Sequence, residues 1–333
     1  MITIGIPVFN RETLVRHALE SALRQPEQDL EILVVDNAST DGTWAVLNGY
    51  RDPRLRLVRN DRNLGLFGNF NRCIFLARGR YVLTLCSDDE LVDGFLGPAR
   101  ALLDADPSLA IVSSRGRATD AVLKRSFPLG SSLPAGVYER EDGVVAALWA
   151  LSVYYQNPFN YPSGILVRAA RARECGGMDE RLSYASDVKL YLAMIEEARL
   201  AIVDRRGCEV LVHLGAEQHN ARSDPARVTE FTHLFDPYES LLERRGLAAG
   251  IREHVAGYLI GSSIKHGLAG RSGFAGAFRA EFRRRSPGWV GALAALADSV
   301  RRRAILARGG PASSPVPVRV QPLPALPPLP PPG

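Results

Sequence analysis

The chain has 333 residues, 46% apolar and 23% charged, which are ordinary values for a folded protein and exclude a wholly disordered or fibrous one. The net charge of +5 is concentrated in residues 271–308, where nine arginines face only Glu281 and Asp298; the slightly acidic remainder excludes a main body that binds nucleic acid through a basic surface. Four cysteines without a C-x-x-C pair are typical of reduced thiols, and the first residues lack a signal-peptide pattern, so we expect a cytoplasmic protein.

Strands and helices alternate in the first 85 residues. Short apolar runs predict four strands, at 2–8, 30–35, 55–59 and 81–85. Helical spacing or a helix-start signal predicts three helices between them, over 11–24, from 41, and over 68–77. This order predicts an α/β fold, with a largely parallel sheet covered by helices on both faces.

The rest of the chain divides into three parts. Residues 110–215 have a more mixed pattern, with strand-like runs at 111–114 and 164–167 and a helical run at 187–197, and we interpret them as a second half of the same domain. We therefore expect one domain over 1–220, followed by a helical extension over 221–308. The last 23 residues hold ten of the 22 prolines, which predicts a disordered or polyproline-type tail over 309–333.

Ligands of open α/β sheets bind beyond the carboxyl ends of the strands, and polar residues follow three of the predicted strands. Ser87, Asp88 and Asp89 follow the fourth. Adjacent carboxylates repel one another unless a cation compensates them, and Mg²⁺ or Mn²⁺ is commonly held by one or two carboxylates together with substrate phosphates. The alternative interpretation is a solvated turn or a helix cap.

Asp36 directly follows the apolar run that ends at Val35. A carboxylate there could accept hydrogen bonds from a ligand, such as a base N–H or a ribose hydroxyl. The residues that follow, from Asp41 to Thr43, are predicted to contribute to a turn that caps the next helix.

Four segments in this order resemble the inverting family 2 glycosyltransferases, whose nucleotide-sugar-binding domain has the GT-A fold. The resemblance spans residues 2 to about 220. Its marks are ITIGIPVFN at 2–10, VVDNASTDGT at 34–43, NLG at 63–65 with Asn69, and LTLCSDD at 83–89. It implies a Rossmann-like mixed sheet flanked by helices.

The resemblance also implies roles for residues near the nucleotide. Pro7 and Phe9 would flank the nucleobase, Asp36 would pair with its edge, and Asn63 would lie near the nucleotide. Phe9 stands where many members have tyrosine.

The metal and ribose-diphosphate motif of the family matches Asp88 and Asp89. The resemblance assigns Asp88 to the nucleotide sugar and Asp89 to a bound Mn²⁺ or Mg²⁺. Cys86 stands where many members place a carboxylate.

A second matching stretch comprises GGMDE at 176–180 and YASD at 184–187. In the family this stretch carries the catalytic base, and Asp187 occupies the matching position. Inversion at the anomeric carbon needs one carboxylate to take the proton from the acceptor hydroxyl. The alternative is that Asp187 or Ser186 caps the following helix, which would leave Asp179 and Glu180 as the remaining candidates for the base.

Family members often have a histidine near the end of this region that reaches the metal or the diphosphate. His213 and His219 both match, and His213 is the predicted metal ligand. The alternative for either residue is an ordinary loop or core histidine.

The predicted function is transfer of a sugar from a nucleoside diphosphate, with UDP expected, to a hydroxyl acceptor with inversion. The chain has no Q-x-x-R-W segment and no run long enough to span a membrane, so we expect a non-processive enzyme. The setting would be bacterial surface polysaccharide or glycolipid assembly, with a glycan or a lipid-linked glycan as acceptor. The alternatives are a nucleotidyltransferase that makes activated sugars, and an inactive scaffold that binds nucleotide sugars.

Arginine triplets at 283–285 and 301–303 flank an apolar stretch at 289–300. This pattern predicts an interfacial helix at an anionic membrane surface, here the inner face of the cell membrane. The alternative is a helix packed on the domain with its arginines in solvent.

Overall fold

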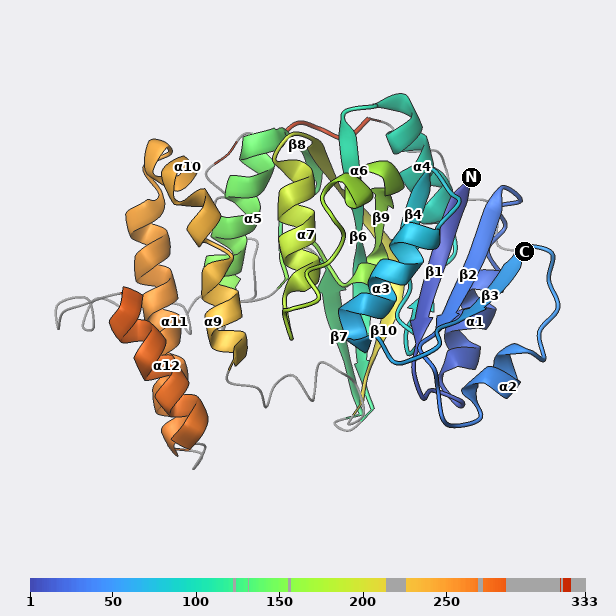
Figure 1. Cartoon of the computed structure of the whole chain (residues 1–333). Coiled ribbons are helices and arrows are strands. Elements are labelled where there is room, and N and C mark those ends of the chain that lie inside the picture. Colours follow the sequence, from blue (N-terminus) through green and yellow to red (C-terminus); the bar gives the residue numbers. More distant parts are fainter. Residues whose placement is uncertain are drawn as a thin grey trace.

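A mixed ten-stranded sheet runs through the computed structural model, which describes residues 1–121, 124–130, 132–154, 157–213, 226–268, 272–285, 318 and 320–324. The strand order is β3-β2-β1-β4-β9-β6-β10-β5, with β7 on β6 and β8 on β10. The strands are β1 (Ile2–Val8), β2 (Leu30–Asp36), β3 (Leu55–Arg59), β4 (Tyr81–Thr84), β5 (Glu90–Leu91), β6 (Leu109–Asp120), β7 (Arg125–Gly130), β8 (Gly136–Tyr138), β9 (Ile165–Arg168) and β10 (Arg199–Val212). The predicted α/β class and mixed sheet are confirmed (Figure 1).

The first four strands are parallel and end at one edge of the sheet. β1 lies between β2 and β4, and β3 pairs with β2. The register places Val8 beside Asp36, and Asp36 beside Arg59. Every residue of β1 and β2 is buried, because helices cover both faces of this half.

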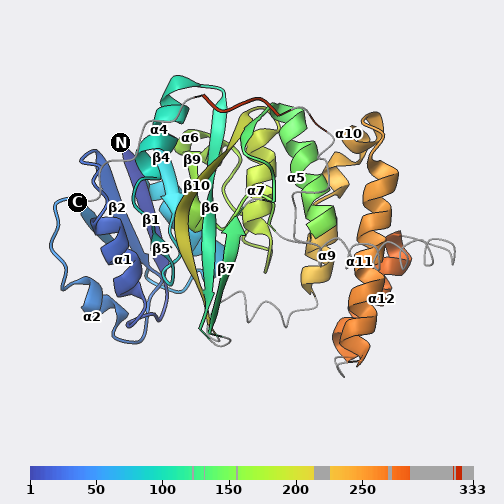
Figure 2. The same ribbon diagram turned by 180° about the vertical axis from the view of Figure 1, so that it is seen from behind.

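Helices lie on both faces of the sheet. They are α1 (Val15–Leu23), α2 (Thr43–Leu47), α3 (Gly65–Leu76), α4 (Leu96–Ala105), α5 (Arg140–Tyr154), α6 (Ala169–Glu174) and α7 (Ser186–Ile195), with a 3₁₀ turn, η1 (Pro162–Gly164). α1 and α4 cover one face (Figure 2), and α3, α6, α7 and α5 cover the other (Figure 1). α3 approaches β1 closely at Gly5, where a Cβ would lie 2.7 Å from the Cβ of Cys73. Gly5 is therefore required for this packing.

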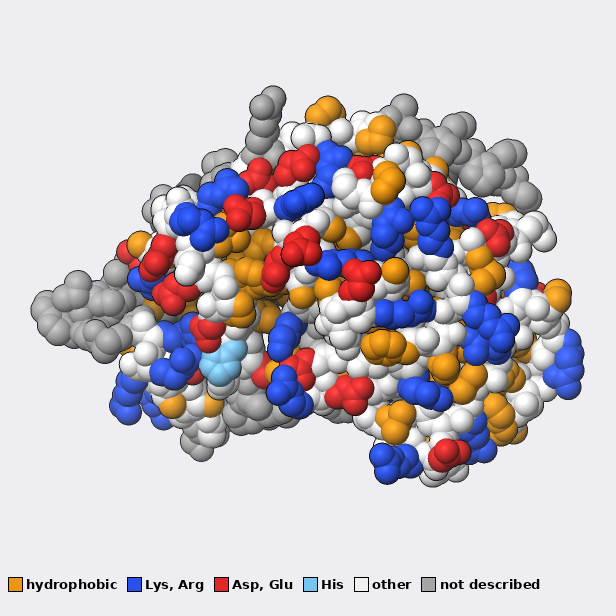
Figure 3. All heavy atoms as spheres, turned by 45° about the horizontal axis from the view of Figure 1, so that its top comes forward, with side chains coloured by type: hydrophobic (Ala, Val, Ile, Leu, Met, Phe, Trp, Pro, Cys, Tyr) orange, Lys and Arg blue, Asp and Glu red, His pale blue; other side chains and the backbone are white. Residues whose placement is uncertain are grey.

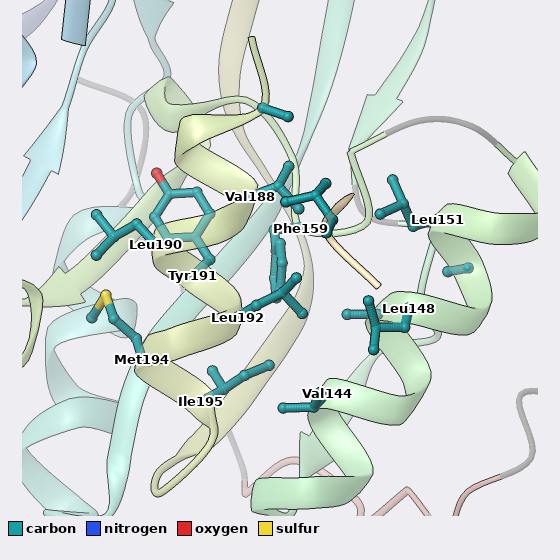
Figure 4. Close-up of a cluster of buried hydrophobic side chains, with 14 of the residues drawn as sticks. Val144, Leu148, Leu151, Phe159, Val188, Leu190, Tyr191, Leu192, Met194 and Ile195 are labelled. Atoms are coloured by element: carbon teal, nitrogen blue, oxygen red, sulfur yellow. The ribbon is translucent and has the colours of Figure 1, made fainter. Parts of the chain in front are cut away.

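α7 is fixed by a buried apolar layer against α5. Val144, Leu148 and Leu151 of α5 face α7, and Phe159 fills the space between the two helices (Figure 4). The ring of Phe159 meets that of Tyr191 edge-on, with centroids 5.5 Å apart. This packing fixes the first turn of α7, which carries Asp187.

The C-terminal helices continue the same core. They are α9 (Ala226–His233), α10 (Glu239–Arg244), α11 (Ala248–Leu268) and α12 (Ser272–Arg285), with a 3₁₀ turn, η2 (Asp236–Tyr238). Val228, Phe231 and Leu259 belong to one apolar cluster with α5 and α7. The helical character predicted after residue 225 is confirmed for the described residues 226–268 and 272–285, and the remainder of the predicted basic helix lies outside the described residues. None of the described helices is both long and apolar enough to cross a bilayer.

A short piece of the proline-rich tail pairs with the sheet. Gln321 and Val137 of β8 form a backbone bridge, with N–O distances of 3.0 and 2.9 Å. The side chain of Gln321 also accepts a hydrogen bond from Arg199 at 2.7 Å. Residues 320–324 are therefore docked on the sheet, where Gln321 pairs with the edge of β8. The polyproline-type or disordered character of the tail as a whole stays a prediction.

The sequence pattern missed much of the second half of the sheet. β6 extends over Leu109–Asp120, well beyond the predicted 111–114. The prediction stopped too early because exposed residues such as Arg117 alternate with buried ones near the end of the strand. The second half of β6, from Arg115 to Asp120, has no continuous apolar run, yet it pairs with both β10 and β7. Figure 3 shows the end of the molecule at which β1 begins, where Asp and Glu lie among the more numerous Lys and Arg.

Candidate active site

A cavity of about 400 Å³ lies at the edge of the sheet where β1, β2 and β4 end. The sequence analysis assigned a role to eight residues, and all of them except Asp36 and His213 line this cavity. The six that line it are Pro7, Phe9, Asn63, Asp88, Asp89 and Asp187. The acids after β4 and the acid at the start of α7 therefore face one space. This convergence is the arrangement that the predicted chemistry requires.

Asp88 and His213 meet beside this cavity. Nε2 of His213 lies 3.0 Å from Oδ2 of Asp88. His213 directly follows β10, so the end of that strand supplies the imidazole. His219, the other candidate, lies outside the described residues.

Asp89 is more deeply placed than Asp88, being 2% exposed. Its Oδ2 accepts a hydrogen bond from the Ser163 hydroxyl at 2.6 Å, and its Oδ1 accepts one from the Leu211 N–H at 3.2 Å. Burial, and next the negative charge of Asp88, raise the pKa of Asp89 well above its usual range. The carboxylate of Asp89 thus links the turn after β4 to η1 and β10, whereas that of Asp88 meets the histidine.

A third potential metal ligand adjoins the two acids. The sulfur of Cys86 and carboxylate oxygens of Asp88 and Asp89 all lie within 4.8 Å of one another. Burial raises the pKa of the Cys86 thiol well above its ordinary value. Carboxylate oxygens suit Mg²⁺ and Mn²⁺, so Asp88 and Asp89 fit the predicted cation, and His213 adjoins Asp88.

Asp36 does not lie on the wall of the cavity. Its side chain is fully buried and accepts hydrogen bonds from the hydroxyl and N–H of Ser39. Its Oδ2 lies 3.0 Å from Nε of Arg59 on β3. The pairing of Asp36 with the edge of a nucleobase stays a prediction; in this structure its carboxylate forms an ion pair with Arg59 of the neighbouring strand.

Asn63 is held in place by Asn37, which the sequence analysis did not assign a role. The side-chain amide of Asn37 donates a hydrogen bond to Oδ1 of Asn63 at 2.8 Å. Oδ1 of Asn37 accepts one from the Leu64 N–H at 2.9 Å. Both asparagines line the cavity. The signal available in the sequence was the position of Asn37 directly after β2.

Asp187 lies in the first turn of α7 and does not cap it. The N-cap position is Ala185, whose φ of +57° is left-handed. The carboxylate of Asp187 accepts a hydrogen bond from Nδ2 of Asn157 at 2.8 Å. Burial raises the pKa of Asp187 to about 6, although the N–H groups of the helix turn and Asn157 favour the charged form.

The two other candidates for the base are occupied elsewhere. Asp179 lies 2.8 Å from both Arg181 and Lys189, and these cations hold its pKa far below the usual range. Glu180 accepts a hydrogen bond from Asn71 of α3 at 2.8 Å. Both residues fix their loop, and neither lines the cavity.

The sequence analysis did not single out the residues that orient these acids. Asn157, Ser163 and Glu230 each contact a site residue or its loop through a side chain distant in sequence. No local pattern marks such contacts. The one sequence feature near them is the run of aromatic residues around Tyr161, which lies between Asn157 and Ser163.

Known proteins are similar to this chain in fold, and a protein family is similar to its first half in sequence. Residues 3–151 match the model of Glycosyl transferase family 2. The fold matches a crystal structure of S. aureus TarS 1-349 in complex with UDP-GlcNAc, with a TM-score of 0.63, 19% identity, and coverage of 90% of this chain and 88% of that one. Residues 3–151 are thus similar to glycosyl transferase family 2, and the chain has the GT-A fold.

Two curated relatives illustrate the range of similarity. An uncharacterized protein, MT1568, of Mycobacterium tuberculosis is 27% identical over 230 residues, covering 68% of this chain and 70% of the relative. The UDP-Glc:alpha-D-GlcNAc-diphosphoundecaprenol beta-1,3-glucosyltransferase WfaP of Escherichia coli is 35% identical over 92 residues. This match covers 28% of this chain and 37% of WfaP.

Proposed function

We propose that this chain is a non-processive, inverting glycosyltransferase that uses a divalent cation and a UDP-sugar. The observation that carries the proposal is the shared cavity of Asp88, Asp89 and Asp187. Acids from two separate segments that line one space suit a reaction in which a diphosphate leaves and a proton is removed.

The charge of the cavity supports a cation. Among the described lining residues, Asp88, Asp89 and Asp187 carry carboxylates and only Arg11 carries a guanidinium. A nucleoside diphosphate brings further negative charge, so its binding needs compensation. We assign Asp88 and His213 as the side chains that would hold the cation. Asp89 would support them without binding it directly, since both of its oxygens already accept protein hydrogen bonds. A bound Mn²⁺ or Mg²⁺ would neutralise the charge that builds on the leaving diphosphate.

Asp187 has the surroundings of a general base. Its pKa of about 6 leaves it mostly ionised at neutral pH, yet more basic than an exposed carboxylate. The acceptor oxygen forms its bond to the anomeric carbon while the bond to the diphosphate breaks on the opposite face. The hydroxyl proton goes to the Asp187 carboxylate, which Asn157 orients.

The nucleotide is proposed to lie beside Pro7, Phe9 and Asn63, where the cavity is lined from the β1 side. Asp36 shapes this region from behind by holding Ser39 and Arg59. A uridine nucleotide is proposed because WfaP uses UDP-Glc.

The acceptor is proposed to be a glycan or lipid-linked glycan of a bacterial surface polymer, presented at the inner face of the cell membrane. The diphosphoundecaprenol-linked acceptor in the name of WfaP supports this class. Aromatic groups on the cavity wall, at Phe67, Tyr161 and Tyr184, suit the apolar faces of sugar rings.

Thermal stabilisation by a panel of UDP-sugars, with and without Mn²⁺, tests the donor and the cation together. We expect stabilisation only when both are present, followed by UDP release and a product with the opposite anomeric configuration. Release of pyrophosphate would favour a nucleotidyltransferase. Binding without any turnover, across donors and acceptors, would favour the scaffold.

A further inference from the structure

The loop that leads into α7 is tied to α9 by the side chain of Glu230. Oε1 of Glu230 accepts hydrogen bonds from the N–H of Ser183 at 2.8 Å and from its hydroxyl at 2.9 Å. Oε2 accepts one from the N–H of Tyr184 at 2.7 Å. One carboxylate therefore binds two consecutive peptide groups, and hydrogen bonds to a charged acceptor are the stronger kind.

Arg227, one helical turn before Glu230, contacts the same loop. Its guanidinium carbon lies 3.7 Å from the centroid of the Tyr184 ring. Residues three apart share one face of a helix, so α9 holds Tyr184 by both its backbone and its ring. Such a cation–π contact adds to the anchoring.

α9 is itself firmly seated. The hydroxyl of Thr232 donates to Glu281 of α12 at 2.6 Å, and the ring of Phe231 packs against that of Tyr258 on α11, with centroids 5.3 Å apart. Figure 1 shows α9 beside the pair formed by α11 and α12. The C-terminal helices thus hold α9 in place. They lie outside the segment that matches the family model, which ends at residue 151.

The anchored residues form part of the cavity wall. Ser183, Tyr184 and Ala185 line it together with Asp187. Ala185 has a φ of +57°, a conformation that costs a non-glycine residue about 1 kcal/mol and needs support from its surroundings. The bonds to Glu230 lie immediately before this residue and set the direction in which the chain enters α7.

We propose that Glu230 is a positioning residue that holds the loop 183–185, and through it places Asp187 and the acceptor side of the cavity. The inference rests on the proposed function, in which Asp187 is the base. It assigns to the C-terminal helices a part in catalysis that the family match does not cover.

The test compares Glu230→Ala and Glu230→Gln with a matched control, Glu243→Ala. Glu243 is an exposed glutamate of α10 that pairs only with Arg252 among the described contacts. Amide hydrogen exchange of the peptide spanning residues 182–190 measures the anchor without any ligand. We expect exchange at Ser183 and Tyr184 to be at least tenfold faster in Glu230→Ala, less so in Glu230→Gln, which keeps one acceptor oxygen, and unchanged in the control.

Turnover and nucleotide binding then separate positioning from general damage. For Glu230→Ala we expect the Kd of UDP with Mn²⁺ to stay within about twofold, and kcat for UDP release from the UDP-sugar to fall about tenfold or more. Glu230→Gln, which keeps the shape of the side chain, should recover part of this loss. Unchanged exchange, or faster exchange with normal kcat, overturns the inference. A wild-type protein that neither binds UDP with Mn²⁺ nor turns over refutes the proposed function itself, and the wild-type result alone identifies that case.

Discussion

His213 and Asp88 are 125 residues apart in sequence, yet Nε2 of the histidine lies 3.0 Å from Oδ2 of the aspartate. The contact joins the end of β10 to the turn that follows β4. It brings an imidazole and a carboxylate, both suitable metal ligands, to the margin of a cavity that has few positive charges.

His213→Ala should weaken binding of Mn²⁺ in the presence of UDP by roughly 10- to 100-fold, because one of the proposed ligands is lost. Titration calorimetry of Mn²⁺ into the protein with UDP measures this. His17→Ala removes an exposed histidine of α1 and serves as the control. Equal Mn²⁺ affinity in both variants would remove His213 from the cation site.

Asp187→Asn should lower kcat by about 100- to 10,000-fold, the range over which a general base contributes, while leaving UDP binding within about twofold. The wild-type rate should fall as the pH drops through about 6, because the raised pKa makes Asp187 take up a proton there and lose its function as a base. Steady-state kinetics between pH 5 and 8 check both points. A variant with near-normal turnover would show that another group accepts the proton.

Asn157→Ala should shift the acid limb of this pH profile to higher pH by up to about one unit. The amide of Asn157 donates to the ionised carboxylate of Asp187 and lowers its pKa, so removing the donor leaves the pKa higher. The same kinetics measured on the variant provide the test. A shift to lower pH would mean that water replaces the amide and solvates the charge better.

Gly177→Ala should destabilise the fold by about 2 kcal/mol or more. Its φ is +75°, and a Cβ there would lie 2.5 Å from Oδ1 of Asn71. That oxygen already accepts the Met178 N–H at 2.7 Å and cannot move freely.

Gly176→Ala is the matched control for this prediction. Gly176 also has a positive φ, of +82°, but a Cβ there would meet nothing within 4 Å. We therefore expect only the conformational cost of about 1 kcal/mol. Urea denaturation of the two variants compares the free energies of unfolding, and equal losses would show that the contact with Asn71 is unimportant.

The first half of the fold and most of the candidate site could be predicted from the sequence. β1, β2 and β3 have nearly the predicted limits, because each is a short apolar run whose pattern is local. The acids at 88–89 follow such a strand, so their place at the cavity follows from the usual position of ligands in open sheets. The place of Asp187 was implied by the resemblance to the glycosyltransferase family.

The sequence by itself determined the alternation of strands and helices, the residues at the carboxyl ends of the strands, and the likeness to a glycosyltransferase family. Only the tertiary structure decided that Asp36 faces Arg59 and not the cavity, that Asp88 and not Asp89 meets His213, and that Glu230 holds the loop before Asp187. The physical reason is that side-chain partners are chosen by the packing of β3, β10 and α9 against distant elements, and that packing leaves no periodic trace in the local sequence.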